Sequence, residues 1–130
     1  MTFDVAKLEY EETNPVLTAA NPVRAANYEH TNSAIGIDWG FGPWRFASQY
    51  VIAGEGTCKL SNGGSCSTAG LQTKLWTLGA RYRFDRQTFV YAIYAHLDNG
   101  VSAQYSNGAP VAPNIGNDID QFAIGVSYSF

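Results

Sequence analysis

The nine residues from Phe122 to Phe130 place an apolar or aromatic residue at every second position. In an extended strand, successive side chains point to opposite faces, so one face of this segment is wholly apolar and the other carries small residues. Terminal residues usually fray in water, so an aromatic residue kept at position 130 predicts either burial or a lipid-facing wall. The residues on the apolar face are Phe122, Ile124, Val126, Tyr128 and Phe130.

Composition favours a single all-β domain over residues 1–130. The chain has 13 Gly, 7 Phe, 8 Tyr and 3 Trp but one Met, which is typical of strands and turns. A net charge of −3 with 8 Lys+Arg argues against nucleic acid as a partner. The mean hydropathy is −0.16, and the sequence lacks the run of about 18 apolar residues that a spanning helix needs. The residues after Met1 do not resemble a secretory signal, because they contain no positively charged segment followed by an apolar one.

Period-two alternation predicts six strands, with lengths close to the ~9–11 residues that a tilted strand needs to cross a bilayer. The predicted strands are 3–11, 31–41, 44–54, 73–84, 88–98 and 119–130. The connections at 40–43 and 85–87 are short, whereas those at 12–30, 55–72 and 99–118 are long. This alternation is typical of an up-and-down antiparallel meander with short turns at one rim and long loops at the other, as in bacterial outer-membrane barrels.

The residues also allow a soluble β-sandwich or a small ligand-binding barrel, in which the polar face of each strand meets solvent. The long connections argue against that reading, because hairpin loops usually have about 2–5 residues. A small outer-membrane barrel with a structural or adhesive role is another alternative.

The segment 75–99 resembles the strand-turn-strand near the end of sixteen-stranded general porins of Gram-negative bacteria. The resemblance rests on Leu78-Gly79-Ala80 with Tyr82, the turn 85–88, Val90-Tyr91-Ala92, Tyr94-Ala95 and Asp98-Asn99. Asp85 and Gln87 depart from the family pattern, which often has Ser and Arg there. The alternation up to Phe130 is similar to the family's closing strand, which the barrel-assembly machinery reads as its signal.

The resemblance implies a trimeric, water-filled channel in the cell outer membrane that admits small hydrophilic solutes and ions. We expect no enzymatic activity and no cofactor, because the sequence contains no phosphate-binding loop, metal-ligand spacing or nucleotide motif. Its partners would be outer-membrane lipid, the assembly machinery and two further copies of the full-length porin. Six strands are too few to close, because bacterial barrels begin at eight. We therefore expect the C-terminal part of a longer porin, or else a small barrel with two more strands hidden in 12–30 or 99–118.

If the apolar face meets lipid, polar residues of the opposite face would line the pore and set ion preference. The predicted pore-lining residues are Lys7, Glu9, Asp38, Arg45, Gln49, Arg81, Arg83, Tyr94, His96, Asp98 and Gln121. Arg45, Arg81 and Arg83 form a basic strip, which either attracts anions or pairs with carboxylates on adjacent strands.

Cys58 and Cys66 have seven residues between them in a Gly/Ser/Thr-rich segment, which predicts a small disulfide loop in an oxidising compartment. A zinc site lacks partners, because His30 and His96 are distant in sequence. An active site is weakly indicated, since His96 and Asp98 supply only two members of a triad and Ser102 follows in a loop.

Overall fold

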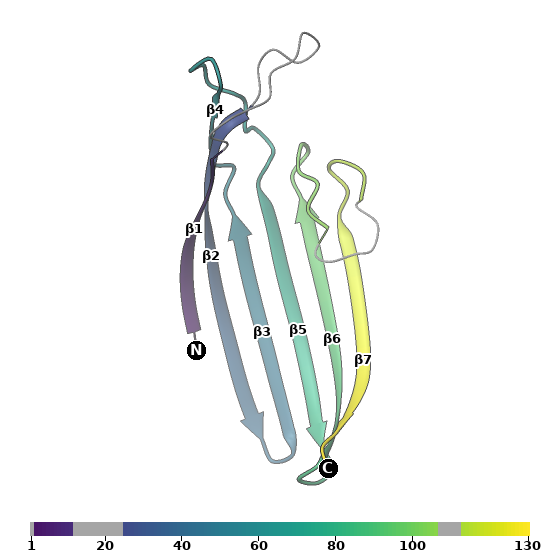
Figure 1. Cartoon of the computed structure of the whole chain (residues 1–130). Helices are drawn as coiled ribbons and strands as arrows, with labels where there is room; N and C mark the ends of the chain where they lie inside the picture. Colours follow the sequence, from purple (N-terminus) through teal and green to yellow (C-terminus); the bar gives the residue numbers. More distant parts are fainter. Residues whose placement is uncertain (1, 12–24, 107–112) are drawn as a thin grey trace.

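The computed structural model describes residues 2–11, 25–106 and 113–130, and these residues form an antiparallel sheet without helices (Figure 1). The predicted all-β class is therefore confirmed. The strands are β1 (Thr2–Glu11), β2 (Ala25–Phe41), β3 (Trp44–Ala53), β4 (Thr57–Leu60), β5 (Thr73–Arg83), β6 (Thr88–Asn99) and β7 (Ile119–Tyr128).

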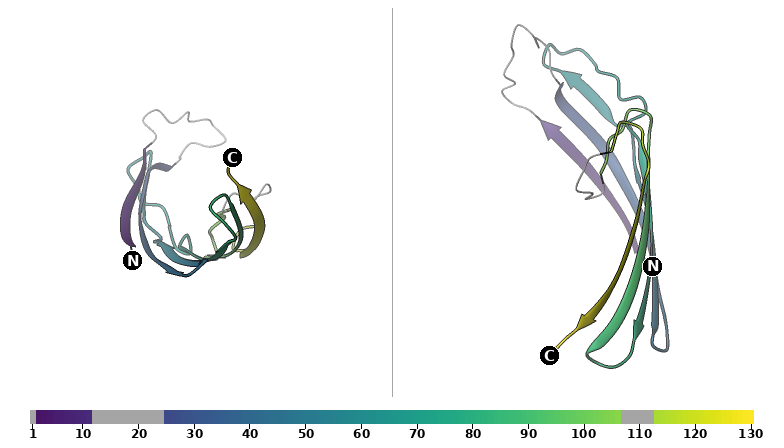
Figure 2. Two further views of the ribbon diagram at one scale, coloured as in Figure 1. Left: turned by 90° about the horizontal axis from the view of Figure 1, so that it is seen from below. Right: turned by 90° about the vertical axis from the view of Figure 1, so that its right-hand side faces the viewer.

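The strand order is β1-β2-β3-β5-β6-β7, and the short β4 pairs with the first part of β2. Each neighbouring pair is antiparallel. The sheet is curved into an open trough, with β1 and β7 along its two free edges (Figure 2). Within the described residues the sheet does not close, because β1 and β7 each pair with one neighbour only.

Large apolar side chains gather on one face of the sheet. The pairs Trp39↔Phe46 and Tyr50↔Trp76 place these residues on that face, because directly paired residues share a side of a sheet. We call it the apolar face; it comprises Ile35, Ile37, Trp39, Phe41, Trp44, Phe46, Tyr50, Ile52, Trp76, Leu78, Tyr82, Val90, Phe122, Ile124, Val126 and Tyr128. Most of these side chains are exposed, up to 75% at Ile124.

The opposite face is concave. The loop that follows β6 lies within the curve of the trough (Figure 2), and Tyr105 of this loop lines one cavity together with His30, Val51 and Leu97. Among the described residues, the buried apolar side chains are Ala53, Ala95 and Leu97 of this concave face and Ala103 of the same loop. They are few and mostly small, so these described residues do not form a large packed core on either face of the sheet.

The predicted strands agree with the structure except around β2 and β4. β2 begins at Ala25 instead of position 31, and its extra residues pair with β4, from Ala25↔Leu60 to Glu29↔Thr57. β4 was not predicted, because its four residues lie in a polar segment without apolar alternation. Residues 100–106 and 113–118 contain no strand, and the remainder of the two long connections that could hide strands, 12–24 and 107–112, lies outside the described residues.

The predicted disulfide between Cys58 and Cys66 is present, with the two Cα atoms 5.2 Å apart. It links β4 to the segment that follows, where the Cys66 amide also donates to the Cys58 carbonyl at 3.2 Å. The disulfide therefore closes a small hairpin beside the first part of β2.

Candidate functional site

The concave face carries most of the charged residues predicted to line a pore. The pairing register places Asp38, Arg45, Gln49, Arg81, Arg83 and Gln121 on this face. Arg45 lies directly opposite Arg81, so β3 and β5 bring two guanidinium groups to the same level. The candidate site is this polar wall.

Arg45 has a carboxylate partner on the neighbouring strand. Its Nε atom donates to both carboxylate oxygens of Asp38, at 2.8 and 3.0 Å. Both side chains are about half exposed, so the pair contributes about 0–1 kcal/mol to stability. For Arg45, the geometry favours the reading in which the arginine pairs with a neighbouring carboxylate.

Arg81 and Arg83 differ from Arg45, because neither forms an ion pair with the described residues. The Arg81 guanidinium lies 5.0 Å from the centre of the Phe89 ring, a cation–π distance. Arg83 lies directly opposite Phe89 in the register. Two positive charges therefore stay without a neutralising carboxylate on this part of the wall.

Tyr94, His96 and Asp98 do not lie on the concave face, so their predicted position is wrong. The register pairs Tyr94 with Leu78 and Phe122 on the apolar face. The prediction assumed that polarity marks the concave face, but β6 carries large apolar side chains on both faces. Only the pairing of β6 with β5 and β7 determines which of its side chains lie on the apolar face.

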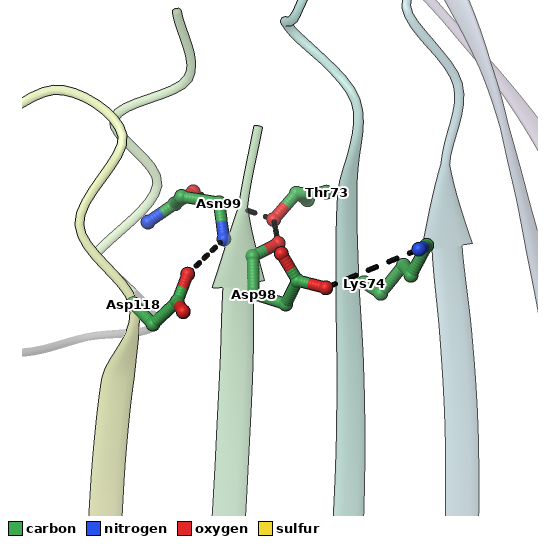
Figure 3. Close-up of polar contacts among 5 residues, drawn as sticks. All are labelled: Thr73, Lys74, Asp98, Asn99 and Asp118. Carbon is green, nitrogen blue, oxygen red and sulfur yellow. Dashed lines mark hydrogen bonds and ion pairs between the residues drawn. The ribbon is translucent and has the colours of Figure 1, made fainter. Parts of the chain in front are cut away.

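These three residues form polar contacts at the long-loop end of the apolar face. His96 Nδ1 lies 2.9 Å from a carboxylate oxygen of Asp120, and the Tyr94 hydroxyl donates to the same oxygen. Lys74 Nζ lies 3.9 Å from Asp98 (Figure 3). The apolar face thus becomes polar toward the long loops.

Lys7 and Glu9 can be placed only by register. Lys7 lies opposite Thr31 and Glu9 opposite Glu29. The side chains of β1 lie outside the described part of the structure, so pore lining by these two residues stays a prediction.

A hydrogen-bonded cluster around Asn99 holds the long-loop end of β5, β6 and β7 together, and sequence reasoning did not single it out. Asn99 is 5% exposed, and its amide nitrogen Nδ2 donates to the carbonyls of Tyr105 and Asn117 at 3.0 and 2.8 Å. Its backbone N–H donates to Asp118, and its Oδ1 accepts from the Thr73 hydroxyl (Figure 3). In the sequence, Asn99 stands out only as the last residue of the segment that resembles general porins.

Aromatic residues collect at the opposite, short-turn end. Trp39 stacks on Phe46, and Trp44 meets the edge of Tyr82 with ring centres 4.8 Å apart. The ring centres of Tyr128 and Phe130 lie 5.8 Å apart at the end of the last strand. The apolar face therefore carries a band of rings at this end, formed by Trp39, Trp44, Phe46, Tyr82 and Tyr128.

The arrangement around His96 does not support a catalytic triad. The carboxylate that contacts His96 belongs to Asp120 on β7, whereas Asp98 faces Lys74. The described residues contain no cluster of three or more His, Cys, Asp or Glu side chains suited to hold a metal ion.

No helix among the described residues is long and apolar enough to cross a membrane.

No family model matches the chain, and neither the curated proteins nor the solved structures yield a match.

Proposed function

We propose that this chain forms part of the wall of an outer-membrane channel of the general-porin type, through which small hydrophilic solutes and ions diffuse. The observation that carries the proposal is the segregation of the two faces. Large apolar side chains stand exposed on one face of β2, β3, β5 and β7, while charged side chains line the concave face. Contact with lipid on one side and with water on the other satisfies both faces.

Strand length supports the same proposal. β3, β5, β6 and β7 have 10, 11, 12 and 10 residues. A tilted strand needs about 9–11 residues to cross the hydrocarbon region. The aromatic band at the short-turn end suits the headgroup level, where amphipathic rings are favoured.

The free edges of β1 and β7 require further strands. An open edge in lipid leaves unpaired backbone N–H and C=O groups, each costing several kcal/mol. In the proposed channel, additional strands therefore pair with both edges and complete a ring, and three such rings form the trimer that the family resemblance implies. The alternating residues from Phe122 to Phe130 would be the segment that the assembly machinery reads.

Conductance tests the proposal. The membrane complex that contains this chain is purified in detergent and added to a planar bilayer, with a tenfold KCl gradient across it. We expect stepwise, ohmic conductance. Arg81→Ala combined with Arg83→Ala should shift the reversal potential toward cation preference, because these arginines form no ion pair with any described carboxylate.

Lys74→Ala is the matched control, because it removes a positive charge from the apolar face and should leave the reversal potential unchanged. Folded protein that inserts without conductance steps would contradict the proposed function. Conductance steps with a reversal potential that the Arg81 and Arg83 substitutions do not change would support the channel. They would show that these arginines do not set its ion preference.

A further inference from the structure

A cavity of about 250 Å³ lies at the long-loop end of the concave face. Val51, Leu75 and Leu97 of three neighbouring strands supply its apolar part. Tyr105 reaches it from the loop after β6, and His30 and Asn32 line it from β2. The cavity is distinct from the part of the wall that carries Arg45, Arg81 and Arg83.

Two polar atoms of this cavity, His30 Nδ1 and Asn32 Oδ1, are buried and have no hydrogen-bond partner among the described residues. They come from the same face of β2, two residues apart. Buried polar groups are almost always hydrogen-bonded, so two orphaned atoms in one cavity call for an explanation.

Polar groups nearby are paired, which sets these two atoms apart. The Tyr28 hydroxyl donates to the Glu55 carbonyl at 3.1 Å, and the Thr73 hydroxyl donates to the Asp98 carbonyl at 2.7 Å. The side chain of Asn99 is also fully engaged. The neighbouring polar groups therefore form hydrogen bonds within the chain, whereas His30 Nδ1 and Asn32 Oδ1 remain available to a ligand.

We propose that this cavity binds a small neutral solute that carries a hydroxyl or amide N–H donor on an apolar body. Asn32 Oδ1 can only accept, so the ligand supplies a donor, and His30 Nδ1 can accept or donate a second bond depending on its tautomer. Apolar walls with a few convergent polar groups are typical of small-molecule sites. Among the residues that the structure describes, no Lys, Arg, Asp or Glu side chain lines the cavity, which disfavours a charged ligand.

The site goes beyond the proposed channel function, because described residues of this chain form it whether or not solutes cross a membrane. Binding can therefore be measured without conductance, and failure of one proposal leaves the other standing. The probe is 4-fluorophenol, a neutral ring with one hydroxyl donor, followed by ¹⁹F NMR in the presence of the detergent-purified membrane complex that contains this chain.

We expect a saturable change of the fluorine signal. Asn32→Leu should weaken binding by about threefold to tenfold, which corresponds to the loss of one hydrogen bond. Tyr105→Ala should weaken it as well, and this variant changes a loop side chain outside every strand. Ser127→Ala, on the concave face at the short-turn end of β7, is the matched control and should bind as the parent chain does.

4-Fluoroanisole, which lacks the donor, separates specific binding from partition into detergent. It should bind at least threefold more weakly than 4-fluorophenol and show no dependence on Asn32. A signal change that does not saturate would overturn the proposal, and so would equal binding to the parent chain, Asn32→Leu and Tyr105→Ala. The cavity would then hold only water.

Discussion

The two faces of the sheet differ in what stabilises them. On the concave face, the long-loop end is held by the protein itself, through the Asn99 hydrogen bonds and the loop that covers Leu97. No described segment covers the apolar face in this way, and Ile124 and Phe122 are about 70% exposed. One face depends on contacts within the chain, whereas the other depends on its surroundings.

The largest expected effect distinguishes the two faces directly. Ile124→Arg places a charge in the middle of β7 on the apolar face and should lower the free energy of unfolding in lipid vesicles by about 2–4 kcal/mol. Ala123→Arg places the same charge on the concave face, where water can solvate it, and should cost less than about 1 kcal/mol. Denaturant titration of both variants in vesicles measures the difference.

Equal losses for the two arginine variants would contradict the assignment of lipid to one face. A loss larger at position 123 than at position 124 would reverse it.

Asn99→Leu tests the region that the chain stabilises by itself. The substitution leaves the carbonyls of Tyr105 and Asn117 without their donor, and we expect a loss of about 1–3 kcal/mol. Hydrogen exchange should increase in residues 100–105 and stay unchanged at the short-turn end. Asn117→Ala is the control, because Asn99 contacts only the Asn117 backbone carbonyl and that group remains.

Asp38 and Arg45 form an exposed pair on the concave face, where we expect a coupling energy of about 0.2–1 kcal/mol. A double-mutant cycle with Asp38→Asn and Arg45→Gln measures this energy. The coupling energy should fall as the salt concentration rises from about 0.05 to about 0.5 M, because exposed charges are screened. Coupling that is independent of salt would mean that lipid or protein shields this face from water.

The smallest expected effect lies in the turn between β5 and β6, which both faces share. The backbone N–H groups of Gln87 and Thr88 donate to Asp85 and hold the pKa of its carboxyl below the usual value. The carboxylate therefore adds stability above the unfolded-state pKa of about 3.9, and that stability is lost as pH falls through the lower folded-state pKa.

Asp85→Asn should remove this part of the pH dependence, as measured by denaturant midpoints between about pH 6 and pH 3. An unchanged pH profile in the variant would show that the turn does not depend on the Asp85 carboxylate. Asp85→Asn should affect both faces of the sheet equally. It therefore serves as a reference for the substitutions that act on one face.

The alternation of apolar residues predicted the bounds of β3, β5, β6 and β7 to within two residues. A strand with an apolar face shows this alternation in its own sequence, so no distant contact is needed to recognise it. β4 and the start of β2 escaped prediction, since their pairing depends on each other and on the disulfide, and not on a local pattern. The parity of β6 also escaped, because Phe89, Tyr91 and Ile93 alternate with Val90, Ala92 and Tyr94 and only cross-strand pairing separates the two sets.

The candidate site was predictable in part for the same reason. Arg45, Arg81 and Asp38 lie on strands with one clearly apolar face, so their position on the other face followed from the sequence. The role of Asn99 depends on where two loops end in space, and the cavity at His30 and Asn32 depends on Tyr105 from a loop that is distant in sequence. No local pattern contains that information.

The most direct test of a lipid-facing and a water-facing side uses spin labels placed one at a time at positions 121 to 127 of β7, with the protein in lipid vesicles. Collision rates with oxygen, which dissolves in lipid, and with a water-soluble nickel complex are measured at each position. The account predicts that oxygen accessibility peaks at 122, 124 and 126 and that nickel accessibility peaks at 121, 123, 125 and 127. High nickel accessibility at all seven positions, or peaks in the opposite phase, would contradict it.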